Sequence, residues 1–166
     1  MRHSCMTLAA LLLLLGGVAR GAGYDVSLEL SNGKDSATAT SKPAGDGPVP
    51  HVDPLAHRAV LQAAADGSFT LKWKVTRTAQ DQAKDELVHF YVVKVEHQGQ
   101  APPPLEPTQV VLEGAVRMDF PNGDTATGTQ PFRLEEPGIY LVCVEAGGDP
   151  DKPGTADAAE LELVAK

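Results

Sequence analysis

Strict alternation of apolar and polar residues is the feature that most constrains the fold of this chain. From Phe69 to Thr76, an apolar residue at every second position is followed by Thr or Lys. Successive side chains of a β-strand point to opposite faces of a sheet, so this period predicts a strand with one buried and one wet face. The same period runs from Tyr24 to Leu30. The pattern therefore predicts an all-β fold.

Further strands are expected toward the C-terminus. Gln109 to Leu112 and Val116 to Phe120 predict strand on either side of Gly114, where we expect a bulge or bend. In GIYLVCVEA one face of a strand would hold Tyr140, Val142 and Val144 and the other Ile139, Leu141 and Cys143, whereas in AAELELV apolar residues alternate with glutamates. A Gly- and Pro-rich loop joins the two segments, which predicts a hairpin. The chain thus holds about seven to nine strands and no long helix, which is typical of a single antiparallel β-sandwich.

The first 21 residues are typical of an export signal. A cationic start at Arg2 leads into the apolar run Leu8 to Val18, and small residues precede a cleavage site after Gly21. The apolar run is too short to cross ~30 Å of hydrocarbon comfortably. We therefore predict a signal peptide at 1–21 and a secreted or periplasmic protein.

About 145 residues then remain, enough for one hydrophobic core. We assign 22–66 to an N-terminal strand plus a long Pro/Gly/Ala-rich loop, with one edge strand expected at Ala37 to Ser41. Residues 67–166 form the body of the sandwich. For Leu55 to Ala65, the alanines suit a helix, whereas the following Asp66-Gly67 suits a β-hairpin. Both interpretations stay open, and we favour the strand.

Charge and cysteine content restrict the partners. The net charge is −8, and loss of Arg2 and Arg20 with the signal makes it −10. Such an acidic surface repels nucleic acid and anionic membranes, so we expect neither as a partner. Cys143 becomes the sole cysteine, which excludes an internal disulfide. A small buried side chain is the favoured role for Cys143, with intermolecular pairing or a reactive thiol as alternatives.

Two segments resemble strands of an immunoglobulin-like domain. GSFTLKWKV is similar to the second strand of that family, and EEPGIYLVCV is similar to the penultimate one, with the Gly138-x-Tyr140 step carrying most of the likeness. The resemblance covers about residues 67 to 164. In that family the tyrosine after the turn hydrogen-bonds to backbone at a sandwich corner.

Trp73 and Val142 fall where antibody-type domains place their bridging cysteines. This departure points to the cysteine-free relatives, such as fibronectin type III-like, polycystic-kidney-disease-like and bacterial adhesion-type modules. The resemblance implies an immunoglobulin-like sandwich. We expect its core to include Trp73, Tyr91, Tyr140 and Val142.

The segment LVHFYVVKVEH is apolar on both faces of a strand. Such a strand needs cover on both sides, from its own chain or from a partner. We expect a stripe of apolar residues on the outer face of one sheet, formed by Val88, Phe90, Val92, Ile139, Leu141 and Cys143. This stripe is either an interface or lies under the long segment 31–65, and both interpretations stay open.

The sequence contains none of the common enzyme motifs: it lacks a nucleophile elbow, a zinc-protease helix motif, a phosphate loop and a dinucleotide fingerprint. We therefore expect no enzymatic activity and no cofactor. The one alternative uses histidines: imidazole and carboxylate ligands suit copper or zinc. A site of that kind would combine His51, Asp53 and His57 with His89 from a strand.

The sequence thus predicts a non-enzymatic secreted or periplasmic β-sandwich that acts as a binding or structural module. Its partner would be another protein or a second copy, held by an apolar sheet face. The alternative is a small periplasmic copper- or zinc-binding protein.

Overall fold

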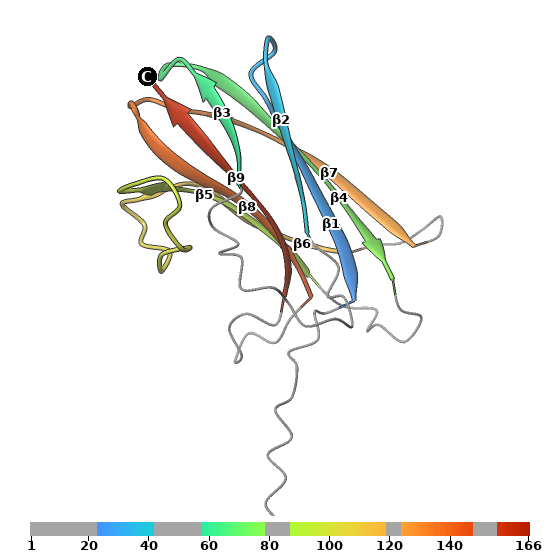
Figure 1. Ribbon diagram of the computed structural model, residues 1–166. Helices are drawn as coiled ribbons and strands as arrows, with labels where there is room; N and C mark the ends of the chain where they lie inside the picture. Colours follow the sequence, from blue (N-terminus) through green and yellow to red (C-terminus); the bar gives the residue numbers. More distant parts are fainter. Residues whose placement is uncertain (1–22, 42–57, 79–86, 119–123, 148–155) are drawn as a thin grey trace, which may run out of the picture.

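The computed structural model describes residues 23–41, 58–78, 87–118, 124–147 and 156–166. These residues form nine strands and no helix (Figure 1). The strands are β1 (Tyr24–Ser31), β2 (Ser36–Thr40), β3 (Ala59–Ala63), β4 (Ser68–Arg77), β5 (Leu87–Val95), β6 (Val110–Arg117), β7 (Thr125–Arg133), β8 (Gly138–Ala146) and β9 (Asp157–Ala165). Within the same ranges, accordingly, no helix has the length and hydrophobicity needed to cross a membrane.

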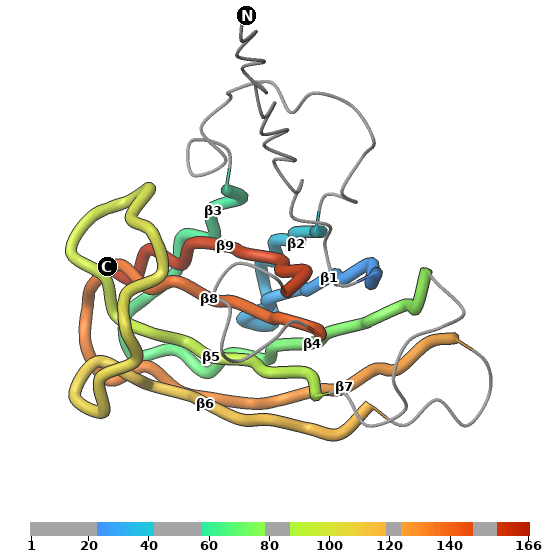
Figure 2. The backbone as a smooth tube through the Cα atoms, turned by 90° about the horizontal axis from the view of Figure 1, so that it is seen from below, coloured from blue at the N-terminus to red at the C-terminus, as the bar shows by residue number. Residues whose placement is uncertain are grey.

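The strands form two sheets, which confirms the predicted all-β sandwich. The four-stranded sheet has the order β2-β1-β4-β7, and the five-stranded sheet has the order β3-β9-β8-β5-β6. Neighbouring strands are antiparallel except for β3 and β9, which are parallel. Figure 2 shows the two layers side by side. The edge strand expected near Ala37 is β2, which pairs with β1.

The segment of uncertain type, Leu55 to Ala65, contains strand β3 and no helix in its described part. The expected hairpin with the next strand is wrong, because β3 and β4 belong to different sheets. β3 runs beside β9 instead, with Leu61 opposite Leu163. The amide of Ala65 extends this pairing by donating to the carbonyl of Lys166 at 2.9 Å. The turn at Asp66-Gly67 therefore carries the chain from one sheet to the other.

The main core lies between the two sheets. Trp73, Tyr140 and Val142 belong to it and are at most 6 % exposed. The ring of Trp73 lies over Gly128 on the neighbouring strand β7, where a Cβ atom would collide with the indole. Tyr91, also expected in this core, is buried in a second cluster on the outer face of the five-stranded sheet.

Gly114 has a different role from the one expected. Gly114 pairs regularly with Phe90, and the ring of Phe90 occupies the space that a Cβ atom of residue 114 would need. The register shift between β5 and β6 lies instead where Val92 pairs with Leu112 and Val93 pairs with Val110. One strand, β6, therefore continues through the glycine.

The corner before β8 has the hydrogen bond that the resemblance implies. The Tyr140 hydroxyl donates to the backbone carbonyl of Glu136 at 2.9 Å. The tyrosine is 3 % exposed, so this bond satisfies a polar group that would otherwise be buried without a partner.

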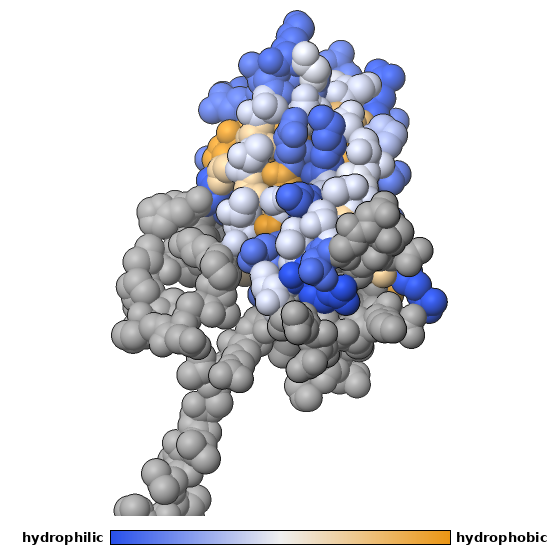
Figure 3. All heavy atoms as spheres, turned by 90° about the vertical axis from the view of Figure 1, so that its right-hand side faces the viewer, coloured by the Kyte–Doolittle hydropathy of each residue, from blue (hydrophilic) through white to orange (hydrophobic). Residues whose placement is uncertain are grey.

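The two sides of the sandwich differ. The short strands β2 and β3 approach each other and close one side. The longer strands β6 and β7 are the edges on the other side (Figure 2). Seen from the right of Figure 1, toward the end of β7, the described surface is mostly hydrophilic or neutral, and hydrophobic residues show in a small area (Figure 3).

Candidate binding surfaces on the five-stranded sheet

The six residues expected to form one apolar stripe lie on two opposite faces. Val88, Phe90 and Val92 point into the main core, whereas Leu141 and Cys143 belong to the outer cluster, against which Ile139 packs. The cause is the register between β5 and β8, which places Val92 opposite Val142 and Phe90 opposite Val144. A shift of one residue exchanges the two faces of a strand, and sequence alone does not supply this register.

The outer apolar cluster is covered by the chain itself. Residues 96–109 connect β5 to β6 and lie outside the sheet (Figure 2). Leu105 from this connection and Val110 at its end pack on the cluster, and Leu141 and Cys143 are fully buried. The sequence suggested residues 31–65 as the cover of this cluster. The described parts of that segment instead form the end of β1, strands β2 and β3, and the turns beside them. The intrachain cover by residues 96–109 buries the apolar centre of the face, whereas Leu87 on β5 and Val60 on β3 stay 51 % and 43 % exposed at its margins.

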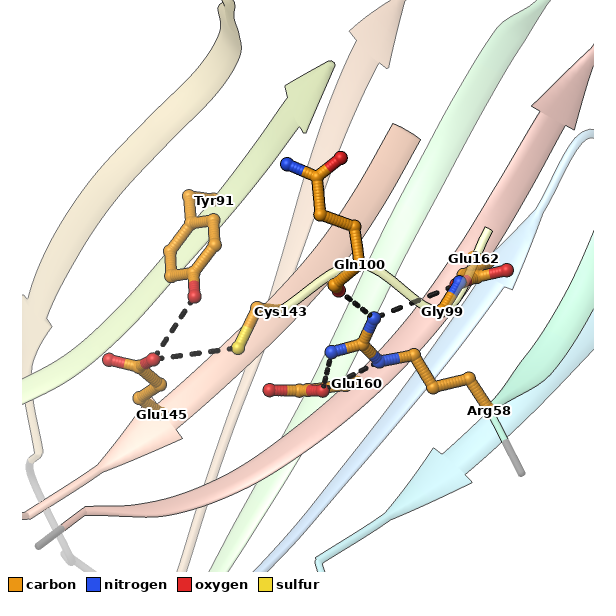
Figure 4. A network of polar contacts seen from close by, with 8 residues as sticks. All are labelled: Arg58, Tyr91, Gly99, Gln100, Cys143, Glu145, Glu160 and Glu162. Carbon is orange, nitrogen blue, oxygen red and sulfur yellow. Dashed lines mark hydrogen bonds and ion pairs between the residues drawn. The ribbon is translucent and has the colours of Figure 1, made fainter. Parts of the chain in front are cut away.

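A buried arginine attaches this connection to the sheet (Figure 4). Arg58 Nε donates to Glu160 Oε2 at 2.7 Å, and its Nη1 donates to the carbonyl of Gln100 at 2.5 Å. Glu162 lies 3.6 Å from the same guanidinium and accepts the amide of Gly99 at 2.5 Å. The Arg58 side chain is 4 % exposed. Since a buried charge is costly when unpaired, these contacts explain why the connection stays in place.

A second polar cluster surrounds His89 on the outer face of β5. Its Nε2 lies 3.2 Å from Glu113 on β6, and its Nδ1 lies 3.7 Å from Glu145 on β8. The Tyr91 hydroxyl donates to Glu145 at 3.1 Å (Figure 4). The contact with Glu145 raises the pKa of His89 most, against an opposing effect of burial. The contact with His89 in turn lowers the pKa of Glu145.

The same cluster holds Cys143 as a neutral thiol. Burial raises the pKa of Cys143 well above its ordinary value, and the nearby Glu145 carboxylate raises it further. The thiolate is the reactive form of cysteine, so a buried thiol beside an anion is poorly suited to nucleophilic chemistry. Burial likewise raises the pKa of Tyr91.

The four residues of the metal hypothesis are only partly described. His89 makes the contacts above, whereas His51, Asp53 and His57 lie outside the described residues. Within the described ranges, no group of three or more His, Cys, Asp or Glu side chains is arranged to hold a metal ion. The copper or zinc site therefore stays a prediction.

Strand β6 offers a surface that the sequence reasoning missed. In the part of the chain that the structure describes, β6 pairs with β5 on one side only. Val111 and Val116 are 39 % and 44 % exposed. The segment VVLEGAVR contains no proline and only two charged residues, which was the available signal for an unprotected edge.

The backbone of β6 presents hydrogen-bonding groups along this edge. The Lys94 amide donates to the Gln109 carbonyl, so the backbone amides and carbonyls of even-numbered β5 residues point toward β6. The backbone groups of their register partners point back toward β5; these partners are Leu112, Gly114 and Val116. Alternation along the strand then directs the amides and carbonyls of three residues away from the sheet. These residues are Glu113, Ala115 and Arg117.

Strand β7 is the corresponding edge of the other sheet. The Arg77 amide donates to the Asp124 carbonyl, and the Leu134 amide donates to the Gly67 carbonyl, so the backbone groups of even-numbered residues along β7 point toward β4. The backbone groups of odd-numbered residues, including Pro131, therefore point away from the sheet. Pro131 has no amide hydrogen to offer there.

No protein-family model matches the chain, and no curated protein matches it significantly.

Proposed function

We propose that this chain is an exported, non-enzymatic, immunoglobulin-like β-sandwich that binds another polypeptide by accepting an extended strand along β6. The observation that carries this proposal is the β6 edge: among the described strands only β5 pairs with β6, the backbone groups of Glu113, Ala115 and Arg117 point outward, and the side chains of Val111 and Val116 are exposed.

The immunoglobulin-like assignment is supported by the strand order. The five-stranded sheet combines a short strand parallel to the last strand with the antiparallel run β9-β8-β5-β6, and the four-stranded sheet ends in β1-β4-β7. The chain thus crosses from one sheet to the other five times between consecutive strands, as expected of a sandwich of this type. The Tyr140 hydrogen bond at the corner before β8 is a second feature of such domains.

Strand addition at β6 has a clear physical basis. A peptide laid along the edge would form backbone hydrogen bonds with three outward residues, each worth roughly 0.5–1.5 kcal/mol net. Side chains of the peptide would also contact the exposed Val111 and Val116, which adds apolar burial. The outer face of the same sheet is less suitable, because residues 96–109 already cover its apolar centre. Export by a signal at 1–21 would place this edge in a secreted or periplasmic setting.

Site-specific photo-crosslinking in cells that export the chain tests the proposal. A photoreactive amino acid replaces Val116, whose side chain is 44 % exposed on β6, and a matched variant carries it at the exposed Thr127 of β7. We expect a crosslinked polypeptide from position 116 and little from position 127. Equal yields at the two positions, or no product at position 116, would contradict the proposal.

A further inference from the structure

We infer that the occupant of the β6 edge is a second copy of this chain, paired antiparallel about a two-fold axis at Ala115. This inference rests on the proposed function, because it uses the same edge. It joins the two five-stranded sheets into one continuous sheet through β6 and its counterpart.

The direction of the backbone groups fits such an axis. The outward residues are Glu113, Ala115 and Arg117, which are spaced symmetrically about Ala115. In an antiparallel pair centred there, Ala115 lies opposite itself, and Glu113 lies opposite Arg117 of the second copy. Every outward amide and carbonyl of this stretch then meets an outward group of the other strand, as narrow hydrogen-bonded pairs require. An axis at Gly114 or Val116 would pair only two of these three outward residues with one another.

Charge complementarity supports the same register. Glu113 and Arg117 have their side chains on one face of β6, since they are four residues apart on a strand. The two-fold therefore places two Glu–Arg pairs directly across the new strand pair, where opposite charges stabilise and like charges destabilise. The Glu113 side chain is 50 % exposed although it contacts His89. Arg117 also interacts within its own chain, and a guanidinium has five donors to share among partners.

The opposite face of β6 is complementary in shape. The same axis places Val116 opposite Gly114 of the second copy, in a non-hydrogen-bonded pair where the strands approach most closely. Gly114 has no side chain, and the ring of Phe90 lies over it. Val116 is 44 % exposed in the single chain and would pack there against that ring. The segment Glu113-Gly114-Ala115-Val116-Arg117 is thus self-complementary in backbone direction, charge and size.

Sedimentation velocity of the purified chain with a reductant tests the inference, over loading concentrations of about 1 to about 200 µM. We expect a reversible monomer–dimer equilibrium. Ala115→Pro removes one outward amide from each copy without touching the bonds to β5, so the dissociation constant should rise at least about tenfold. The matched control is Thr127→Pro, which removes an outward amide from β7 and should leave the equilibrium unchanged.

Charge exchange makes the test independent of proline. Glu113→Arg and Arg117→Glu each place like charges across the axis, so each variant alone should be monomeric. Mixing the two single variants restores two opposite-charge pairs and should yield a heterodimer, and the double exchange should restore the homodimer. Circular dichroism and melting of each variant verify that the fold is retained.

The outcomes separate this inference from the proposed function. A wild-type chain that stays monomeric over the whole concentration range, or a dimer that Ala115→Pro leaves intact, overturns self-pairing at β6. If position 116 nevertheless crosslinks to a different polypeptide, strand addition stands and only the second copy is excluded. A monomeric chain without any crosslink at position 116 overturns both.

Discussion

The two edges β6 and β7 lie on the same side of the sandwich but are protected to different degrees. β7 directs Pro131 toward its free edge and exposes threonines at 125, 127 and 129. β6 has no proline and exposes two valines. Exposed edge strands are templates for unwanted pairing, and proline is a common protection against it. This difference favours pairing at β6 over pairing at β7.

Both edges are nevertheless held to their own sheets by the same device, an aromatic ring lying over a glycine of the edge strand. The pairs are Trp73 over Gly128 for β7 and Phe90 over Gly114 for β6. Each ring belongs to an inner strand and is nearly fully buried. The edges therefore differ in what they offer to a partner, while their attachment is alike.

The largest effect is expected from filling these two positions. Gly128→Ala and Gly114→Ala each force a Cβ atom into an aromatic ring, and overpacking of this kind costs ~1–3 kcal/mol of the free energy of unfolding. Urea unfolding monitored by circular dichroism measures both. Gly33→Ala at a turn, where a Cβ atom meets no neighbour, controls for the loss of glycine, although its positive φ adds some strain. Losses at Gly114 and Gly128 no larger than at Gly33 would contradict the shared device.

The sequence predicts some strands of this fold well and others poorly. Alternation in β1, β4 and β9 is sufficient to predict strands in two layers, because a strand with one wet face has a period of two. It fails at β5 and β8, where both faces are buried. There the partner of each face depends on the register between these two strands and on the connection 96–109, and both are long-range features.

The candidate site was harder to predict than the fold. A proline-free apolar segment is visible in the sequence, yet only pairing partners show that β6 is an edge and that Ala115 faces outward. The same holds for Arg58, whose contacts with Glu160 and Glu162 join residues about a hundred positions apart. The interface expected at Cys143 reflects the opposite error, since the residue's apolar surroundings come from its own chain.

A smaller effect should follow from removing the protection of β7. Pro131→Thr restores an outward amide and extends the run of threonines, so the β7 edge should become able to pair. We expect additional self-association beyond the dimer, with a dissociation constant higher than that of the β6 pair. Light scattering at high protein concentration measures this effect. Combining Pro131→Thr with Ala115→Pro isolates the β7 contribution. A strictly unchanged mass for Pro131→Thr would show that threonine side chains alone protect this edge.

The smallest effect concerns pH, to which β6 is coupled through the contact of Glu113 with His89. The pKa of His89 is raised above 6.5, so its pairing is complete below that value and is lost as the pH rises through the raised pKa. The pKa of Glu145 is lowered below 4.5, so its part is complete above that value and is lost as the pH falls further. The ion pairs of the cluster therefore stabilise the contacts among β5, β6 and β8 most between about pH 4.5 and 6.5.

NMR titration of the His89 ring should give a pKa above 6.5. This pKa should fall in Glu145→Gln and fall less in Glu113→Gln, because the contact with Glu145 raises it more. The matched comparison is β7: its amide shifts should change little over the pH range in which those of β6 follow His89, and equal changes on both edges would show that the titration is not local to β6.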